Sequence, residues 1–519
     1  MLSRRIQIYL AVTLATLMSA GTGRAQGAAP FHVQEASIAS IHEAMRAGRL
    51  TCVQLVQAYL NRIAASDQAG PKLNAIQNIN SAALPIAAEM DARARASGML
   101  TGRLHCVPVI LKDSINTNFM PTTFGSALFK NFVPPKNATV VERLRAEGAI
   151  ILAKANMGEY AQGYSGSAFG DCHNAYDPRR SPSGSSCGTG VGIAANFAAI
   201  GIGEDTAGSI RGPAAHGSLV GLRPTLQLVS RAGMMPYEPS RDTLGPITRS
   251  VADAALVLDI IAGYDPEDPI TAWSYGQKPR TYSDFLIANG LAGMRLGILR
   301  VPMARDTNIA APDYKEIQDA ITGAARAMAG RGAEIVDPLV IPNLKELVAA
   351  AGGGAPETET AINAFLGQFP NAPARSLREI VDSPLVIAKR REELGRDLGQ
   401  TVTDADIVKS AHDREELRNL VLRVMADNRL DIILYATYDH APTPVPISTP
   451  GTNRVLASAL GFPAMAIPGG FFKDGLPIGL EILARPFAEG TLFKAAYDLE
   501  QTAKYRRPSP LVPPLPQEP

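Results

Sequence analysis

Six short apolar runs spaced along the chain are the feature that most constrains its fold. Runs of this length suit buried strands and are too short for buried helices. Helical patterns lie between several of them, for example at Lys315–Ala329 and Glu415–Ala426. Strands that alternate with helices predict an α/β sandwich with a largely parallel or mixed sheet. The six runs are Val107–Leu111, Ile150–Ala153, Leu296–Leu299, Ile335–Val336, Ile432–Tyr435 and Ile478–Leu483.

Length and composition favour a single large domain. A chain of 519 residues allows roughly three domains, or one large enzyme domain. Hydrophobic residues make up 46% and charged residues 19%, which is an ordinary globular balance. No internal repeat and no change in composition divides the chain, and the Pro-rich segments Pro442–Pro450 and Pro508–Pro519 suit surface loops. We therefore predict one domain over residues 30–507 and a Pro-rich tail over residues 508–519.

The first 25 residues have the pattern of a secretory signal peptide. Arg4 and Arg5 form a positive start, and Ile6–Ala20 is mostly apolar. Gly23 and Ala25 place small residues where a signal peptidase cleaves. The alternative is a transmembrane anchor, but the apolar run is shorter than the ~20 residues that a span needs. We expect residues 1–25 to be removed and the mature protein to be secreted or periplasmic.

The charge balance argues against partners that depend on a strong electrostatic field. Fifty Lys and Arg residues stand against 49 Asp and Glu residues, so the formal net charge is +1. Nucleic acids and anionic membranes attract strongly basic proteins. After the signal peptide no stretch reaches 18 uninterrupted apolar residues. We therefore expect neither a nucleic-acid partner nor a membrane partner for the mature protein.

The cysteines and histidines form no metal-binding motif. Cys52, Cys106, Cys172 and Cys187 include no CxxC pair, and the seven histidines include no HxH or HExxH pattern. We therefore expect no metal. In an oxidising compartment Cys172 and Cys187 could form a disulfide, although free thiols are at least as consistent with a chain of this size.

Residues 181–225 are unusually dense in Gly, Ser and Ala. Small residues let backbone approach backbone, or let a ligand approach main-chain N–H groups. Within this region Val191–Ile200 is helix-like, and Gly184–Gly188 satisfies the GxSxG nucleophile pattern with Ser186 at its centre. An α/β-hydrolase would also need a downstream histidine, and three histidines follow, ending with His440. A pattern this short occurs readily by chance in a Gly- and Ser-rich segment.

Several longer blocks resemble the amidase signature family of serine hydrolases. They are VPVILKDSINT (107–117), AKANMGEYA (153–161), SPSGSSCGTG (181–190), EDTAGSIRGPA (204–214), VGLRPT (220–225), LGPITRSVADAA (244–255) and LGFPAMAIPGGFFKDGLPIGLEILARPFAE (460–489). Together they follow the order and spacing of the family from about residue 35 to about residue 505. The resemblance implies a single large α/β/α sandwich with a mixed central sheet, and amide hydrolysis without a cofactor.

Carried over residue by residue, the resemblance implies a Ser-cisSer-Lys triad. Ser209 matches the nucleophile, Ser185 the serine that follows a cis peptide bond, and Lys112 the general base. On this assignment Ser186 is only a neighbour of the triad. Ser183 stands where the family commonly has a glycine ahead of the cis serine.

The resemblance also implies an oxyanion hole and two supporting residues. Asp205 and Arg211 match recurrent family positions, and we expect them to orient the nucleophile loop by ion pairing. The family commonly has Gly-Gly before the nucleophile, so Ala207 would be strained if its position requires a positive φ. The oxyanion hole is assigned to the backbone N–H groups of Thr206, Ala207, Gly208 and Ser209.

The chemistry of such a triad sets requirements on the lysine. A serine hydroxyl is a weak nucleophile until a base takes its proton. A lysine is a base only as the neutral amine, which burial favours because it penalises the ammonium form. We therefore expect Lys112 to be buried beside hydroxyl groups, with no carboxylate at its nitrogen. Asp113, the next residue on an extended strand, should point to the opposite face.

These observations predict an exported amidase that hydrolyses linear amide C–N bonds of a small-molecule substrate through an acyl-enzyme. An esterase, a urethanase or a peptide C-terminal amidase would use the same machinery, and a non-catalytic binding protein would keep the fold alone. The family's glutamyl-tRNA amidotransferase subunits are disfavoured because an export signal would separate this chain from tRNA. Residues 340–420 match no pattern that identifies the substrate.

Overall fold

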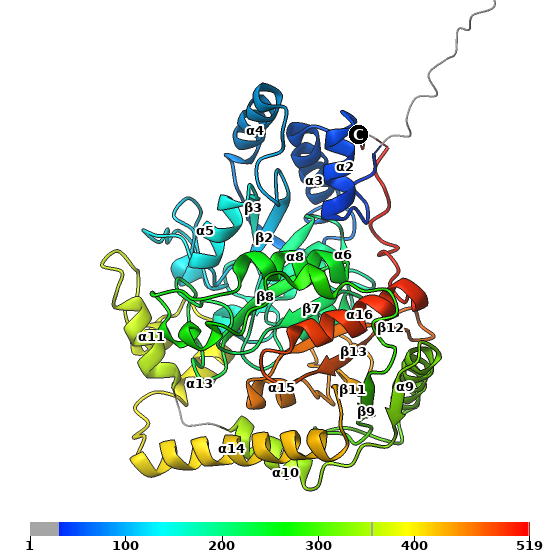
Figure 1. Ribbon diagram of the computed structural model, residues 1–519. Coiled ribbons are helices and arrows are strands. Elements are labelled where there is room, and N and C mark those ends of the chain that lie inside the picture. Colours follow the sequence, from blue (N-terminus) through cyan, green and yellow to red (C-terminus); the bar gives the residue numbers. More distant parts are fainter. Residues whose placement is uncertain (1–30, 354–356, 517, 519) are drawn as a thin grey trace, which may run out of the picture.

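One central sheet of 11 strands organises the molecule (Figure 1). The computed structural model describes residues 31–353, 357–516 and 518, so the predicted signal peptide lies outside the described residues. In space the strands follow the order β1-β3-β2-β6-β8-β7-β12-β13-β11-β9-β10, and β4 pairs separately with β5. Their bounds are β1 (Ile76–Ile79), β2 (Pro108–Lys112), β3 (Ile150–Ala155), β4 (Ser165–Gly166), β5 (Gly170–Asp171), β6 (Ile200–Asp205), β7 (Val220–Arg223), β8 (Thr243–Thr248), β9 (Arg295–Ile298), β10 (Glu334–Val336), β11 (Ile432–Ala436), β12 (Ala464–Phe471) and β13 (Pro477–Leu483).

The sheet is mixed, which confirms the predicted α/β class. β2 runs parallel to both of its neighbours, β3 and β6, and β9 runs parallel to β10 and β11. The strands between these two groups pair antiparallel, from β6 through β8, β7, β12 and β13 to β11. All six apolar runs singled out in the sequence lie in strands to within one residue, and all but Ile335–Val336 of the edge strand β10 are buried.

Helices form most of the long connections. At the start of α3 the side chains of Thr51 and Gln54 each accept the other's backbone N–H, a capping box that fixes where this helix begins. The two helices expected from periodicity are found as α9 and α14. The helix bounds are α2 (Ile38–Arg46), α3 (Cys52–Ser66), α4 (Ala83–Ser97), α5 (Thr139–Ala146), α6 (Cys187–Ala194), α7 (Arg211–His216), α8 (Val251–Ile261), α9 (Pro312–Gly330), α10 (Leu344–Gly352), α11 (Thr358–Leu366), α12 (Leu377–Asp382), α13 (Ala388–Gly395), α14 (Asp404–Asp427), α15 (Val455–Leu460) and α16 (Glu489–Ala503), with short 3₁₀ turns at η1 (Ala127–Phe129), η2 (Glu159–Ala161), η3 (Pro269–Ser274) and η4 (Tyr282–Phe285).

The expectation of a helix-like stretch over Val191–Ile200 is wrong at its end. α6 stops at Ala194, and Ile200 is the first residue of β6. Glycines in β6 allow its neighbours to pack directly on the strand: a Cβ at Gly201 would lie 2.5 Å from Thr189 Cγ2 of α6. The Gly- and Ser-rich region therefore contains α6, β6, α7 and β7, and its small residues let these elements pack closely.

The Pro-rich C-terminal segment is docked onto α3. The buried Arg62 of α3 donates to the carbonyl oxygens of Val512 at 3.1 Å and Pro513 at 3.3 Å. Figure 1 shows this red segment beside the blue helices α2 and α3. Arg506 forms an ion pair of 2.7 Å with Glu35 close by. Within the described ranges no helix combines the length and the apolar character needed to cross a membrane.

Candidate active site

Lys112, Ser185 and Ser209 lie in one unbroken chain of hydrogen bonds. Lys112, the last residue of β2, donates from Nζ to Ser185 Oγ at 2.6 Å. Ser185 Oγ donates in turn to Ser209 Oγ at 3.1 Å. Lys112 and Ser185 are buried, whereas Ser209 is only half-buried. The structure thus brings the predicted triad together, with Ser209 as its one partly exposed member.

A carboxylate also contacts the lysine, which corrects the expectation of hydroxyl partners alone. Glu204 Oε2 accepts a hydrogen bond from Lys112 Nζ at 2.5 Å. The contact arises because β6 runs parallel beside β2, so the carboxyl ends of both strands meet at one edge. Asp113 points away as predicted and pairs with Lys154 at 3.0 Å instead.

The loop that carries Ser185 is held by close backbone contacts. The Gly184–Ser185 peptide bond is cis, as the resemblance implied. A Cβ at Gly184 would lie 1.9 Å from the carbonyl oxygen of Gly163, so only glycine fits there. Ser183 has φ 61° and its hydroxyl lies 2.7 Å from the hydroxyl of Tyr438. The left-handed residue ahead of the cis serine is therefore a serine with a side-chain anchor.

The nucleophile loop differs in one respect from the expected oxyanion hole. The N–H of Gly208 donates to Asp205 Oδ1 at 2.8 Å, so it is not free to bind an oxyanion. No acceptor for the N–H groups of Ala207 and Ser209 occurs among the described residues. Gly208 has φ 106°, whereas Ala207 is not among the residues with positive φ. The alanine is therefore unstrained, and the glycine that the turn requires is Gly208.

Asp205 and Arg211 hold this loop by ion pairing, as expected. Both residues are fully buried, and Arg211 Nη2 lies 3.2 Å from Asp205 Oδ1. Arg223 at the end of β7 pairs with the same oxygen at 2.9 Å. Burial alone would raise the pKa of Asp205, but the two guanidinium groups hold it well below its usual range. The carboxylate is therefore ionised and fixes the backbone just ahead of Ser209.

Comparison with known proteins identifies the family. A family model described as Amidase matches residues 54–493. The chain belongs to the amidase signature family. A "Probable amidase" of Arabidopsis thaliana is 32% identical over 530 residues and covers 96% of each chain. A glutamyl-tRNA(Gln) amidotransferase subunit of Thermosynechococcus vestitus is 31% identical, and the match covers 91% of this chain and 99% of its own.

A solved structure gives the same answer for the fold. The peptide amidase of Stenotrophomonas maltophilia superposes with a TM-score of 0.83 at 36% identity, over 91% of this chain and 98% of its own. The large mixed sheet is thus the amidase signature fold, and the protein is an amide C–N hydrolase.

Behind the lysine of this amidase lies a buried group that the sequence did not reveal. The hydroxyl of Thr206 lies 2.7 Å from Glu204 Oε1 and 2.7 Å from Asp242 Oδ1. Asp242 precedes β8, the antiparallel neighbour of β6. Burial, with the neighbouring Glu204, raises the pKa of Asp242 to about 7. Only the pairing of β2, β6 and β8 brings these residues together, so no local sequence signal could find them.

Arg454 is a further residue that the sequence analysis missed. Its Nη1 donates to the carbonyl oxygens of Gly208 at 2.9 Å and Gly184 at 3.3 Å. Its guanidinium lies 4.6 Å from the centre of the Tyr438 ring. One side chain therefore joins the nucleophile loop of the amidase to the loop of the cis serine.

The alternative nucleophile Ser186 is not arranged for catalysis. It is fully buried, and its hydroxyl donates to the backbone oxygen of Glu204 at 3.1 Å. His216 bonds to the carbonyl oxygen of Ser181 at 3.0 Å, and His440 lies 3.2 Å from Asp313. Neither histidine contacts Ser186, so the GxSxG match in this amidase is accidental.

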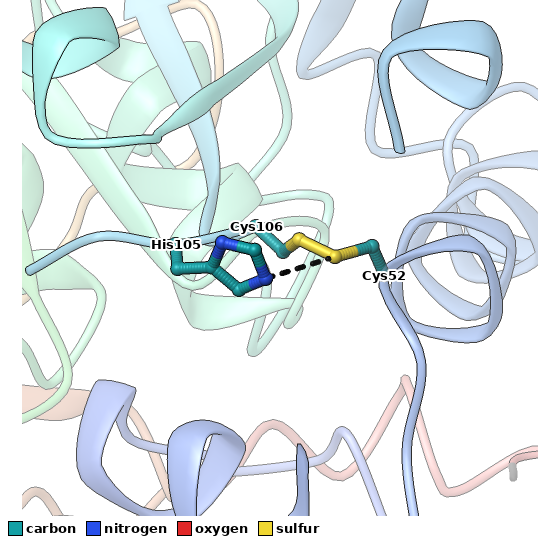
Figure 2. A group of neighbouring side chains, drawn as sticks. All are labelled: Cys52, His105 and Cys106. Carbon is teal, nitrogen blue, oxygen red and sulfur yellow. Dashed lines mark hydrogen bonds between the residues drawn. A yellow bond between two sulfur atoms is a disulfide. The ribbon is translucent and has the colours of Figure 1, made fainter. Parts of the chain in front are cut away.

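The cysteines pair differently from the possibility raised by the sequence. Cys52 and Cys106 form a disulfide with a Cα–Cα distance of 5.4 Å, while Cys172 and Cys187 are free and buried. His105 lies beside this disulfide, with Nε2 at 3.5 Å from Cys52 Sγ (Figure 2). These three side chains are the one group among the described residues with the spacing of metal ligands. Sulfur atoms bonded to each other are not thiolates, so this group cannot ligate a metal while oxidised.

A cleft of about 770 Å³ lies next to Asp242. Its lining includes Met234, Pro236 and Phe365 of α11. The segment that matched no sequence pattern thus contributes a wall close to the buried carboxyl group.

Proposed function

We propose that this chain is an exported amidase that cleaves carboxamide bonds through an acyl-enzyme on Ser209. The observation that carries the proposal is the continuous contact from Lys112 Nζ through Ser185 Oγ to Ser209 Oγ, in which Ser209 is the one residue that is partly exposed. A buried amine linked to an accessible hydroxyl is the arrangement that serine activation by lysine requires.

The geometry supports the following sequence of steps. Ser209 Oγ attacks the amide carbon, its proton passes to Ser185 Oγ, and the proton of Ser185 passes to the neutral amine of Lys112. The oxygen that becomes negative is placed near the N–H groups of Ala207 and Ser209, where each donor contributes about 3–4 kcal/mol to the transition state. The C–N bond then breaks as the relay returns a proton to the leaving amine. Water hydrolyses the ester in the same way.

The substrate class that we propose to test first is the peptide C-terminal amide. The support is the similarity to the peptide amidase of Stenotrophomonas maltophilia, at 36% identity over nearly its whole length. Esters and carbamates are the next candidates, because the same hydroxyl, relay and oxyanion donors would act on them.

A fluorophosphonate probe and a substrate panel test the proposal. We expect the probe to label wild type and Ser186→Ala but not Ser209→Ala, and Ser185→Ala to react slowly. Ser186 is the matched control because it lies next to Ser185 and yet contacts only backbone. Labelling that survives in Ser209→Ala and disappears in Ser186→Ala would replace this assignment. Absence of labelling in wild type would favour a non-catalytic binding protein.

Export is a separate part of the proposal. Its support is the signal-peptide pattern over residues 1–25 and the Cys52–Cys106 disulfide, a bond that persists in oxidising compartments. N-terminal sequencing of protein recovered outside the cytoplasm should begin after about residue 25. Recovery of protein that still begins with Met1 would contradict cleavage.

A further inference from the structure

One hydroxyl lies between two buried carboxyl groups. Thr206 Oγ1 is 2.7 Å from Glu204 Oε1 and 2.7 Å from Asp242 Oδ1, and all three side chains are buried. A threonine hydroxyl carries one hydrogen and can donate to only one of these oxygens. Two oxygens at 2.7 Å without a hydrogen between them repel each other. A second proton must therefore reside on one of the two carboxyl groups.

The surroundings place this proton on Asp242. Glu204 Oε2 faces the amine of Lys112 at 2.5 Å, which favours an ionised Glu204. Among the described residues, Asp242 Oδ2 accepts from the backbone N–H groups of Tyr237 at 2.8 Å and Glu238 at 2.9 Å and from no other donor. Asp242 Oδ1 can then donate to Thr206, and Thr206 can donate to Glu204.

The other charged groups around Asp242 do not neutralise it. Glu238 is itself acidic and opposes ionisation of Asp242. The basic groups nearby pair elsewhere: Arg223 with Asp205 at 2.9 Å, Arg231 with Asp268 at 2.8 Å, and Arg241 with Glu238. The direction of the pKa of Asp242, raised by burial and by Glu204, agrees with the hydrogen count.

We propose that Glu204, Thr206 and Asp242 are positioning residues that set the proton affinity and the direction of the Lys112 amine. Glu204 accepts one N–H of the neutral amine, so that the lone pair of Nζ faces Ser185 Oγ. The protonated Asp242, acting through Thr206, draws charge from Glu204. Glu204 therefore does not hold Lys112 permanently as ammonium.

The proton balance is simple in this arrangement. The resting cluster holds an ammonium, one carboxylate and one carboxylic acid, and its net charge is zero. Activation releases one proton from Lys112 Nζ to solvent, breaking one N–H bond. During acylation the proton of Ser185 forms the N–H bond again as Ser185 takes the proton of Ser209. This role of the cluster rests on the proposed function of Lys112 as the base.

Two variants should move the pH dependence of kcat/KM in opposite directions. Glu204→Gln removes the negative charge at Lys112, so the acid limb should shift to lower pH, by roughly one to three units. Asp242→Ala removes the donor behind Thr206, so the limb should shift to higher pH. Asp242→Asn should reverse part of the Ala effect, because its amide can donate to Thr206 and accept from residues 237 and 238. If the variants lose rate but the acid limb of kcat/KM does not shift, the cluster has only a structural role and the proposal is overturned.

Infrared difference spectroscopy tests the protonation without any need for activity. At pH 6 the spectrum of wild type should contain the carbonyl band of a protonated carboxylic acid, and this band should be absent from the spectrum of Asp242→Asn. Asp265→Asn is the matched control, because Asp265 is a buried carboxylate that accepts from Ser230 at 2.5 Å and Thr139 at 2.6 Å. Burial opposes its ionisation, but these hydroxyl donors keep the pKa of Asp265 below its usual value. No band should be lost there.

The two tests separate the proposals from each other. If Asp242→Asn loses no carboxylic-acid band, the shared proton is absent and the present inference fails even in an active amidase. If the band is lost but Lys112→Ala retains the rate and pH profile of wild type, the proposed function of Lys112 fails, and with it the role assigned to the cluster.

Discussion

Asp205→Asn should destabilise the protein strongly, because the Asp205 carboxylate accepts five hydrogen bonds from buried donors. Oδ1 accepts from Gly208 N at 2.8 Å, Arg223 Nη1 at 2.9 Å and Arg211 Nη2 at 3.2 Å. Oδ2 accepts from Ile210 N at 3.0 Å and Arg211 Nε at 3.2 Å. Asparagine has nearly the same shape, so the change removes the charge and one acceptor without opening a cavity.

The size of the expected loss in the free energy of unfolding follows from these contacts. Whichever oxygen becomes the amide nitrogen, at least two N–H donors then face an N–H₂ group. Each stranded donor costs about 1–3 kcal/mol, and breaking a buried ion pair costs about 3–5 kcal/mol. We therefore expect the free energy of unfolding to fall by about 3–5 kcal/mol.

Chemical denaturation followed by circular dichroism measures this loss. Asp177→Asn is the matched control, because Asp177 pairs at 3.0 Å with Arg179, whose side chain is 88% exposed. An exposed pair of this kind contributes about 0–1 kcal/mol. A loss below about 1 kcal/mol in Asp205→Asn would refute the view that the ion pairs hold the nucleophile loop.

A second check is the pH dependence of the difference in the free energy of unfolding between wild type and Asp205→Asn. Burial opposes ionisation, but Arg211 and Arg223 keep the pKa of Asp205 below its unfolded value. The ionised form therefore stabilises the protein above the unfolded pKa of about 3.9, and this contribution is lost as pH falls through the folded value. The difference between wild type and Asp205→Asn should be constant from about pH 5 to about pH 8 and should narrow below about pH 4.

Three further variants test other parts of the structure. Replacing Cys52 and Cys106 together by Ala opens a loop with a sequence separation of 54 residues. Chemical denaturation should show that the free energy of unfolding falls by about 4 kcal/mol. Cys172→Ala is the control, because it removes a cysteine and leaves the disulfide intact. Gly208→Ala places a Cβ 2.4 Å from Arg454 Cβ at φ 106°, and the resulting shift of Ser209 should lower the rate of probe labelling by about 100-fold or more. Ala207→Gly, which restores the common family residue, should not raise kcat/KM and should destabilise the fold by about 0.4–1 kcal/mol in a melt, because Ala207 is unstrained.

The sequence predicts most readily the strands in which apolar residues follow one another without interruption. β2 and β3 are buried along their whole length, and each contains such an apolar run. β6 was missed because Gly201 and Gly203 interrupt its pattern, and their lack of a side chain is what lets Thr189 and Ile210 approach the strand. Close packing of neighbouring elements therefore hides a strand from an analysis of periodicity.

In the candidate site, too, some features could be predicted from the sequence and others depend on how the strands and helices pack. The triad positions rest on the family resemblance, since the only nucleophile pattern in the residues themselves, GxSxG, pointed to Ser186. Glu204 could not be predicted as a partner of Lys112, because the two are 92 residues apart and meet only through the pairing of β6 with β2. The Cys52–Cys106 pairing could not be predicted either, because it depends on how the start of α3 packs against the segment that leads into β2.

The position of β2, β6 and β8 within the sheet determines how this enzyme should lose its activity on unfolding. On one side β3 and β1 separate these strands from the edge, and on the other side six more strands follow. Amide hydrogens at such central strands exchange only when a protein opens globally, whereas edge strands and chain ends fray at a much lower cost. Heat or denaturant can therefore release β1 or β10 while the three central strands stay paired. Inactivation should coincide with cooperative unfolding of the whole sheet, without an earlier stage in which the fold persists and the site is gone.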